Sequence, residues 1–581
     1  MSEPRSISRA RLLASVVWPL AVTGALAALV GTLGFNPTDE GLVLSYGYRI
    51  LHGEIPHLDF ISPRPIGSSV LHLVDFLIPG PLLLTSRVIA LCEMTAIALL
   101  FGVLVFRSAP ARWNTWQISL VVIALIVDLH TFPLMAWYTI DGVLLTLAGF
   151  VLLRTAEAGR GRRCMGLLLC GLALTTKQSF FAAPVAATLI AAWPCLRINR
   201  TAFVRRFVSS GLISAIPITL MVLALVGLGA GSAMTAQLLN PGTVDFLAVL
   251  GPSGLWALVL GAVVVGVTLV GRSSWWSDGT RVVRVRQWSS GGLVGVSLVI
   301  LISGGLALDG EWGNQLFTLL LAYVLVRLVL TRRLDVDAVL VLALGWMASL
   351  SWGNAVADLC AGGLTLTIAW RAWMLTRYTV SLGPRVAKIS VAAAVVVAVL
   401  AVAWGVSIRQ SRIYRDSPAP QLTAHLSSVA APLGGLVSTP MTLRYLDDLK
   451  ICVRLHPARW VAVVPDNASL YAIMGWHNPF PIDWMLPGDY VGSGSRLIAS
   501  ARSLDARGDY LVIFQTFPAG TLETTTRSAY SREAALVAAD PNMTLPYAPG
   551  VLQQIRNQLH GTTFACGAFI ALYSPAHLRG S

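Results

Sequence analysis

A group of acidic side chains follows the first apolar run of the sequence. Asp39 and Glu40 are adjacent and come a few residues after that run, and Glu54 and Asp59 follow in the same polar stretch. Carboxylates at a membrane boundary are costly unless they are solvated or paired, and a positioned carboxylate can act as a general base. Two structural explanations compete with a catalytic one: a solvated acidic loop, or an Asp-Glu-Gly cap on a helix that starts near Leu42.

Basic side chains on the outer side of the predicted topology form a second candidate group. Of the 28 Lys and Arg residues before position 409, 24 fall in segments that we place in the cytoplasm, where basic residues collect. The four exceptions are Arg49, Arg64, Arg87 and Lys177. Lys177 could bind an anion, cap its turn or extend to the headgroups. Glu93, inside the second predicted span, could pair with Arg87 only through a bend, or face a polar groove.

The composition explains why these residues are interpreted by their position relative to a membrane. The chain has 581 residues, of which 55% are hydrophobic and only 12% charged, whereas a soluble domain carries about 25% charged residues. This predicts a polytopic membrane protein and excludes a disordered chain, a collagen-like chain and a small secreted disulfide scaffold. The net charge of +14 then reflects basic cytoplasmic loops, so we predict no nucleic-acid partner.

Apolar runs set the predicted spans, since a helix needs about 20 such residues to cross a bilayer. The runs lie near 12–35, 81–106, 116–135, 138–153, 207–230, 252–271, 289–308, 314–331, 338–356, 358–375 and 389–407. The stretch 164–195 lies between two basic clusters, which predicts two short helices with 175–178 at the outer tip. About 13 transmembrane helices result, with a cytoplasmic N-terminus and an extracytoplasmic C-terminus in the cell membrane.

The predicted fold class is an α-helical polytopic membrane protein with an extracytoplasmic α/β C-terminal domain. Residues 1–408 form the transmembrane module, with a first outer loop at 36–80, and residues 409–581 form the soluble domain. Cys452 and Cys566 are the only cysteines of that domain, and an oxidising exterior favours a disulfide between them. Periodicity predicts strands at 460–464, 510–514 and 568–573 and helices at 495–504 and 532–539.

Several polar residues are predicted at the outer ends of the third and fourth spans. They could line a substrate cleft, and a satisfied hydrogen-bond cluster is an equal alternative. Together with the paired acids they could form an oxygen-rich divalent metal site, although no spacing pattern specifies one. These residues are Asp128, His130, Tyr138 and Asp141.

The first loop resembles that of the GT-C glycosyltransferases, integral-membrane enzymes that use lipid-phosphate sugars. Asp39-Glu40 matches the paired acidic motif of that family's first outer loop. Residues 53–60 (GEIPHLDF) resemble a G-x-I-P-Y-x-D-F segment, with His57 replacing the aromatic residue. Arg64-Pro65 resembles the family's Lys-Pro-Pro motif, with Arg in place of Lys and without the second Pro.

Two later segments extend the resemblance. Residues 171–178 (GLALTTKQ) resemble the family's segment that ends in Leu-Thr-Lys. Residues 465–471 (PDNASLY), followed by 475–479 (GWHNP), resemble a recurrent motif of the family's C-terminal domains. The likeness covers the first loop, the hairpin around Lys177 and one part of the tail, and the intervening helices match in hydropathy only.

The resemblance implies transfer of a sugar, with inversion, from a polyprenyl-phosphate donor to an extracytoplasmic glycan, lipid or protein. Phosphate leaves as a stable anion, so the reaction needs one carboxylate base and cations that hold the phosphate, but no general acid. Asp39 is the expected base, and Glu40 its partner toward the acceptor or a metal. Lys177 and Arg64 are the expected donor-phosphate ligands.

The implied substrate contacts are Glu54, His57, Asp59, Tyr138 and Asp141. No cofactor is certain, a divalent metal is possible, and the membrane lipid is a partner. The alternative is a transporter or flippase, or a lipid-linked-glycan ligase. A transporter would favour internal repeats and charges at mid-membrane, and a ligase would carry its long polar loop between late helices.

Overall fold

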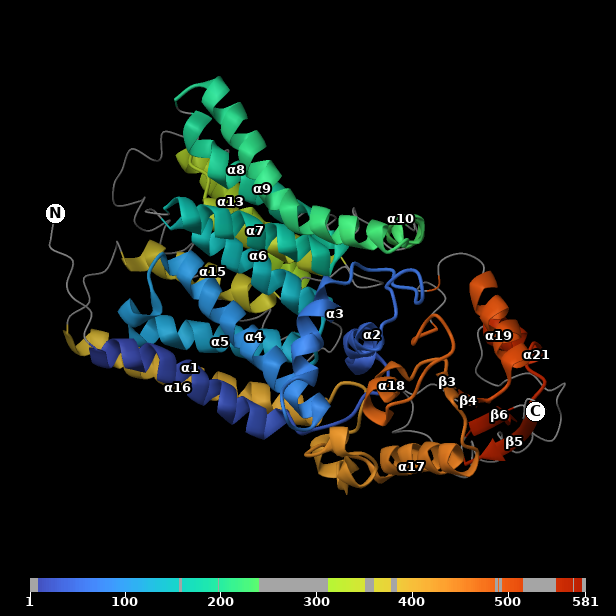
Figure 1. Ribbon diagram of the computed structural model, residues 1–581. Coiled ribbons are helices and arrows are strands. Elements are labelled where there is room, and N and C mark those ends of the chain that lie inside the picture. Colours follow the sequence, from blue (N-terminus) through green and yellow to red (C-terminus); the bar gives the residue numbers. More distant parts are fainter. Residues whose placement is uncertain are drawn as a thin grey trace.

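The computed structural model describes residues 9–155, 159–196, 198–239, 312–350, 360–377, 384–485, 490, 494–515, 550–567 and 569–576. Figure 1 shows a bundle of long helices beside a smaller α/β region formed by the C-terminal residues. Within the described chain, four helices are long and apolar enough to cross a membrane, at 11–30, 82–106, 178–196 and 200–227. The predicted spans 252–271 and 289–308 and the predicted helix 532–539 lie outside the described residues.

The bundle helices follow the predicted apolar runs closely. α4 contacts α5, α6 and α15 in the centre, and α1 and α16 lie side by side along one flank (Figure 1). Fully buried apolar side chains such as Phe101, Ile140 and Phe150 fill this core. The helices are α1 (Arg9–Val30), α4 (Leu82–Phe106), α5 (Thr115–Thr131), α6 (Tyr138–Arg154), α7 (Arg160–Thr176), α8 (Ala182–Leu196), α9 (Arg200–Gly227), α10 (Gly231–Leu238), α13 (Trp312–Thr331), α14 (Val336–Ser349), α15 (Ala361–Arg377) and α16 (Pro384–Ser411).

The stretch 164–195 forms the predicted pair of short helices. α7 ends at Thr176, Lys177 is extended, and a 3-10 turn, η4 (Gln178–Phe181), leads into α8. Both helices pack against α9. A Cβ on Gly171 would lie 1.9 Å from the carbonyl oxygen of Ser214, so glycine permits the close approach of α7 to α9. Packing of both α7 and α8 against α9 therefore fixes the position of Lys177, which lies between the two helices.

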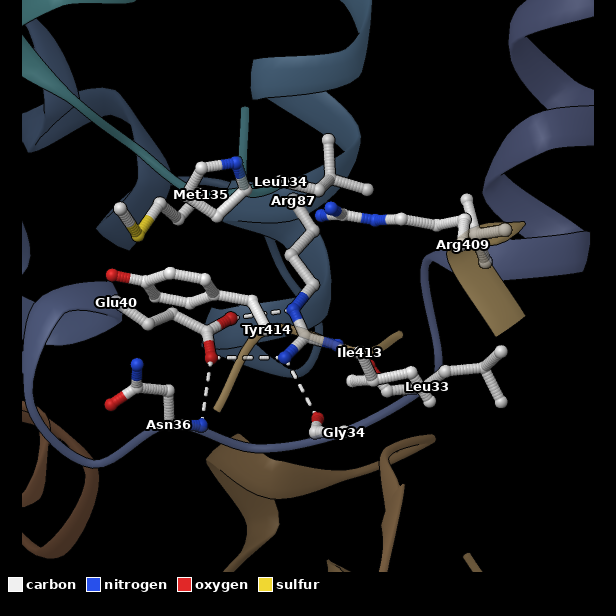
Figure 2. Close-up of a pocket in the computed structure, with 12 residues that line it drawn as sticks. Leu33, Gly34, Asn36, Glu40, Arg87, Leu134, Met135, Arg409, Ile413 and Tyr414 are labelled. Atoms are coloured by element: carbon white, nitrogen blue, oxygen red, sulfur yellow. Dashed lines mark hydrogen bonds and ion pairs between the residues drawn. The ribbon is translucent and has the colours of Figure 1, made fainter. Parts of the chain in front are cut away.

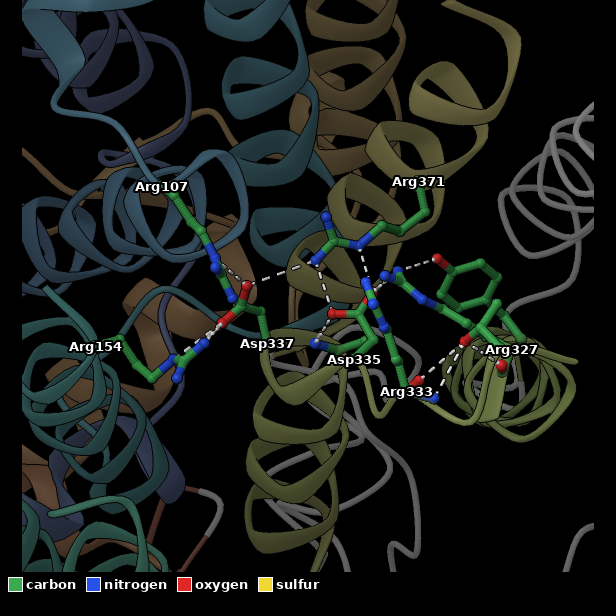
Figure 3. Close-up of polar contacts among 10 residues, drawn as sticks. Arg107, Arg154, Arg327, Arg333, Asp335, Asp337 and Arg371 are labelled. Carbon is green, nitrogen blue, oxygen red and sulfur yellow. Dashed lines mark hydrogen bonds and ion pairs between the residues drawn. The ribbon is translucent and has the colours of Figure 1, made fainter. Parts of the chain in front are cut away.

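Basic residues that the topology places in the cytoplasm gather around two acids at one end of the bundle (Figure 3). Asp337 accepts Arg107 Nε at 2.7 Å and Arg154 Nη2 at 3.0 Å, and Asp335 accepts Arg327 and Arg371 at 2.6 and 2.8 Å. The network joins helices that are distant in sequence. Its arginines come from separate predicted cytoplasmic segments, and their meeting at one end agrees with their placement on one side.

The first outer loop is folded and largely buried, unlike the solvated loop that was one of the alternatives. Its elements are η1 (Asp39–Gly41), α2 (Leu42–Leu51), α3 (Gly67–Leu71) and η2 (His72–Phe76). α2 buries Leu42, Val43, Leu44 and Tyr46 against the C-terminal region. The loop therefore forms a layer between the bundle and the C-terminal region.

The C-terminal region is built on a four-stranded sheet of order β3-β4-β6-β5. β3 (Trp460–Val464) and β4 (Tyr510–Gln515) are parallel, and β6 (Phe569–Ser574) pairs antiparallel with β4 and β5 (Thr562–Cys566). The three predicted strands match β3, β4 and β6. The predicted helix 495–504 is α19 (Ser495–Arg507), while α17 (Pro440–Leu455), α18 (Ala468–Met474), α21 (Gly550–Asn557), β5 and the short β1–β2 ladder (Ala424–His425 and Val437–Ser438) were not predicted.

A disulfide joins Cys452 of α17 to Cys566 of β5, with their Cα atoms 5.9 Å apart. This is the pair expected from the sequence. Because 114 residues separate the two cysteines, the bridge closes a long loop, and a cross-link of that kind restricts the unfolded chain by about 4–5 kcal/mol in the chain-entropy description. The bridge ties the helix that precedes β3 to the edge of the sheet.

Candidate functional site

Asp39 lies in a buried turn where the first loop meets the end of the last bundle helix. Its side chain is 5% exposed, Tyr414 donates a short hydrogen bond to Oδ2, and Arg415 Nη2 lies 3.3 Å from the same oxygen. Oδ1 has no hydrogen-bond partner. Burial raises the pKa of Asp39 and outweighs Arg415, Tyr414 and Arg64, which lower it. Asp39 is thus a carboxylate with one oxygen anchored and one available.

Glu40 points the other way and is fully engaged by Arg87 (Figure 2). Arg87 Nε lies 2.5 Å from Oε1 and Nη2 lies 2.9 Å from Oε2. Arg87 also donates to the carbonyl oxygens of Gly31, Leu33 and Gly34 at the end of α1. The guanidinium therefore pairs with backbone carbonyls of the segment that follows α1 and fixes the turn that carries Asp39.

The C-terminal region closes over this turn. A Cβ on Gly41 would lie 2.0 Å from the Cα of Ser469, so only glycine permits α18 to approach so closely. Ser469 donates to the carbonyl oxygen of Pro37 from both its backbone nitrogen, at 3.1 Å, and its hydroxyl, at 2.8 Å. Residues 465–471, one of the segments singled out in the sequence, thus pack directly on the acidic turn.

Arg64 is buried beside the start of α6 and makes no direct contact with an acid among the described residues. Its guanidinium carbon lies 5.0 Å from the ring centroid of Tyr138 and 5.7 Å from that of Trp137. Only 8% of the residue is exposed, and Nη1 has no hydrogen-bond partner. Among the described residues Arg64 forms no ion pair, and aromatic faces hold the cation in place.

Lys177 is the second buried basic side chain at this position, and burial, together with the charge of Arg64, lowers its pKa to about 7. It is 5% exposed, and its Nζ donates to the hydroxyl of Thr139 at 3.2 Å. No carboxylate pairs with it in the part of the chain that the structure describes. The next residue, Gln178, donates to the carbonyl oxygen of Pro63 at 2.6 Å. This bond joins the hairpin tip to the backbone just before Arg64, so the two cations share one support.

The other acids and the histidine predicted in the first loop hold the loop itself. Glu54 pairs with Arg49 at 2.6 Å, and Asp59 accepts the backbone N–H of Ile55 at 2.6 Å. His57 is fully buried, has a left-handed φ of 66° and lies with Nδ1 2.9 Å from Gln237 Oε1. None of the three contacts Asp39 in the structure.

Of the polar residues predicted at the ends of the third and fourth spans, only Asp141 joins a cluster with metal-ligating groups. That cluster contains His72, Glu93 and Asp141. Asp128 instead accepts the backbone N–H of Gly362 at 2.8 Å. The oxygen-rich group of Asp39, Glu40, Asp128 and Asp141 considered from the sequence is not what the described residues assemble, because helix packing directs Asp128 toward α15.

Three residues of the site follow the last bundle helix and were not predicted. Tyr414 and Arg415 contact Asp39, and Asp416 accepts the backbone N–H of Phe35 at 2.9 Å and the Ser438 hydroxyl at 2.6 Å. The only available signal was a short polar run, Arg412 to Asp416, directly after an apolar span. Its pairing with the first loop crosses more than 370 residues, which local patterns do not encode.

A small cavity of about 30 Å³, partly open to solvent, lies beside Glu40 and Tyr414. Glu40, Arg87, Arg409, Tyr414, Met135 and Leu134 line it, and Figure 2 shows these side chains around one space. Loop, bundle and C-terminal segments all contribute to its wall. The arrangement is a small mixed-charge cavity next to the turn that carries Asp39, and neither Arg64 nor Lys177 lines it.

Comparison with known proteins adds a structural likeness but no sequence relative. The sequence matches no protein-family model and no curated protein. Among solved structures, the fold is similar to the crystal structure of ArnT from Cupriavidus metallidurans bound to undecaprenyl phosphate. The match covers 98% of this chain and 99% of that one, at 11% sequence identity and a TM-score of 0.35. A likeness of this size assigns neither family nor activity.

Proposed function

We propose that this chain is an integral-membrane glycosyltransferase that moves a sugar, with inversion, from a polyprenyl-phosphate donor to an extracytoplasmic glycan, lipid or protein. Asp39 is the general base, and Arg64 and Lys177 bind the donor phosphate. The soluble domain of residues 409–581 closes the site from outside. The motifs of the first loop motivated this function, and the geometry of the two cations supports it.

The observation that carries the proposal is a pair of buried basic side chains that form no ion pair with any other described residue. Arg64 and Lys177 are 8% and 5% exposed, and Arg64 acts on Asp39 only through its field. Keeping an ion in a buried site costs several kcal/mol unless it is paired. A lipid phosphate provides the missing anion, and Arg with Lys supplies a forked donor and a point charge suited to it.

Asp39 suits the role of general base because its two carboxylate oxygens have different hydrogen-bond partners. Tyr414 and Arg415 hold Oδ2, which leaves Oδ1 to accept the proton of an acceptor hydroxyl. Burial raises its pKa, and a base with a raised pKa is a stronger proton acceptor. Arg64 lies near enough to lower that pKa, which is consistent with a base and a phosphate ligand that act on the same donor.

The remaining predicted residues receive supporting roles. Glu40 positions Asp39 through Arg87, and Tyr138 holds Arg64 by its ring. Glu54 and His57 shape the loop through Arg49 and Gln237, and Asp59 remains a candidate substrate contact at the loop's edge. Gln237 also accepts the backbone N–H of Ser62 at 2.9 Å, so α10 fixes the segment that leads to Arg64.

Lys177→Met tests the phosphate role, because it removes a buried charge and keeps the volume. We expect affinity for a polyprenyl monophosphate in nanodiscs to fall about 10–100-fold, the loss of one or two kcal/mol from a charged hydrogen bond. Thermal stability without lipid phosphate should stay equal or rise, since an uncompensated charge is gone. Arg444→Met, at an exposed position of α17, is the control. Unchanged affinity in Lys177→Met would remove this residue from the phosphate site.

The pH dependence of transfer tests the environment of Asp39. A base works when deprotonated, so activity should be full above its pKa and fall as pH drops through it. Burial raises that pKa while Arg415 lowers it. Arg415→Gln should therefore move the acidic limb of the kcat profile to higher pH, whereas Arg415→Lys should keep it near the wild-type position. A limb that stays in place or moves to lower pH in Arg415→Gln would contradict the proposed base.

The function as a whole is tested by mass spectrometry of envelope glycans and glycoproteins from a deletion strain. We expect one sugar residue to be missing from one acceptor and to return with the wild-type gene. An envelope identical to that of the parent strain would argue for the transporter or another alternative.

A further inference from the structure

Three side chains with metal-ligating atoms meet behind the proposed phosphate site. They are His72 of η2, Glu93 of α4 and Asp141 of α6, and one ligand atom from each lies within 4.8 Å of the others. His72 and Asp141 are 2% and 1% exposed. η2 and α4 are consecutive in the sequence, and α6, which follows later, packs against α4 in the folded chain.

The cluster contains buried polar atoms without hydrogen-bond partners. These atoms are His72 Nε2, Glu93 Oε2 and both carboxylate oxygens of Asp141. The contact between His72 Nε2 and Asp141 Oδ1 is 3.4 Å long and does not have hydrogen-bond geometry. Buried carboxylate oxygens are normally paired or bound to a metal, so three such oxygens beside an imidazole nitrogen, all without hydrogen-bond partners, favour a bound cation.

Asp75 orients the histidine for this role. Both of its carboxylate oxygens lie 3.1 Å from His72 Nδ1, and Asp75 is itself buried. A carboxylate on the other ring nitrogen is the usual support for a metal-bound histidine, because it fixes the tautomer and turns the free nitrogen toward the ion. Here that nitrogen is Nε2, which faces Asp141.

We propose that His72, Glu93 and Asp141 bind a divalent transition-metal ion, with Asp75 as the supporting group of His72. One imidazole and two carboxylates suit Zn²⁺ or Mn²⁺ better than Mg²⁺ or Ca²⁺, which prefer oxygen ligands alone. Bonds of about 2.0–2.2 Å place ligand atoms up to ~4 Å apart, so small side-chain rotations close the present spacing. Two carboxylates also balance the charge of the ion.

The site would fix the start of α6. Asp141 follows Tyr138 and Thr139, which hold Arg64 and Lys177. Binding of a metal would thus join η2, α4 and α6 close to the residues that hold Arg64 and Lys177. This inference does not depend on the proposed function, because metal content is measured without any transfer assay.

The competing state is a protonated imidazole between Asp75 and Asp141. Burial disfavours that state, but the nearby carboxylates of Asp141 and Asp75 outweigh burial and raise the pKa of His72 to about 11. The metal content of the wild type therefore decides between the two states.

The experiment uses the full-length protein in detergent, stripped with EDTA, incubated with ZnCl2 and desalted before elemental mass spectrometry. We expect about one zinc ion per chain in the wild type and a loss of that ion in His72→Ala and Asp141→Asn, while Asp75→Asn should weaken affinity about 10–100-fold. His560→Ala is the matched control, since His560 lies 2.7 Å from Asp505 on the exposed surface. Its zinc content should equal that of the wild type.

Two results would overturn the proposal. One is a wild-type protein that retains less than about one-fifth of a zinc ion per chain, since a site of this kind is expected to bind tightly. The cluster would then hold a protonated His72 and no metal ion. The other is equal zinc content in the wild type and folded His72→Ala. If Asp141→Asn does not fold, the zinc stoichiometry of the wild type still decides the question. Electron paramagnetic resonance of the stripped wild type with added Mn²⁺ is a second measurement: a bound-ion signal supports the site, and a free-ion signal alone contradicts it.

Discussion

Asp39→Asn should reduce sugar transfer by about 10²–10⁴-fold, the usual contribution of a positioned general base. Asparagine keeps the shape of the side chain and can still interact with Tyr414 through its carbonyl oxygen, but it cannot accept the proton of the acceptor hydroxyl. Affinity for polyprenyl monophosphate should be retained, because Arg64 and Lys177 are untouched. The readout is restoration of the missing glycan in a deletion strain, together with lipid-phosphate binding in nanodiscs.

The control for this variant is Asp447→Asn, the same chemical change at a half-buried position of α17. It should restore the glycan fully. Loss of both transfer and lipid binding in Asp39→Asn would point to a structural role for the residue, and unchanged transfer would remove Asp39 as the base. Normal thermal stability of the variant is required for either conclusion. The raised pKa of Asp39 also predicts that replacing it with asparagine leaves the fold intact, because burial already disfavours its charge.

Much of the helical fold could be predicted because each span is a local pattern. The run 81–106 became α4, and the hairpin around Lys177 formed where two basic clusters required an even number of crossings. The run near 207–230 was less well bounded: α9 begins at Arg200, because Asn199 caps the helix by accepting the backbone N–H of Ala202 at 2.6 Å. Caps of this kind begin helices within polar sequence, where hydropathy gives no signal.

The candidate site could be predicted only in part, because its residues were identified by type and not by partner. Asp39 and Arg64 were chosen from a motif, but Tyr414 and Arg415, which hold Asp39, lie more than 370 residues further along the chain. His72 was not chosen, since one histidine in a loop has no local signature, and Glu93 found its partners only across helices. β5 was missed for a related reason: its alternation is weak, and its pairing with β6 defines it.

Arg87→Ala should destabilise the protein by about 3–5 kcal/mol, the usual effect of breaking a buried ion pair. The change leaves Glu40 charged and buried, with both carboxylate oxygens unpaired. It also removes three hydrogen bonds from the carbonyl oxygens that follow α1. We expect a lower midpoint of thermal unfolding in detergent and loss of transfer, because the turn that carries Asp39 is no longer held.

A double replacement separates the charge from the packing. Glu40→Leu with Arg87→Leu removes both ions and leaves no buried charge unpaired, and apolar replacement of such pairs is often close to neutral. The double variant should therefore be more stable than either single leucine variant, although the carbonyl bonds after α1 are still lost. If its destabilisation equals the sum of the two single effects, the ion pair does not couple the residues. Glu40 would then not position Asp39 through Arg87, and the two adjacent acids could share a direct chemical role.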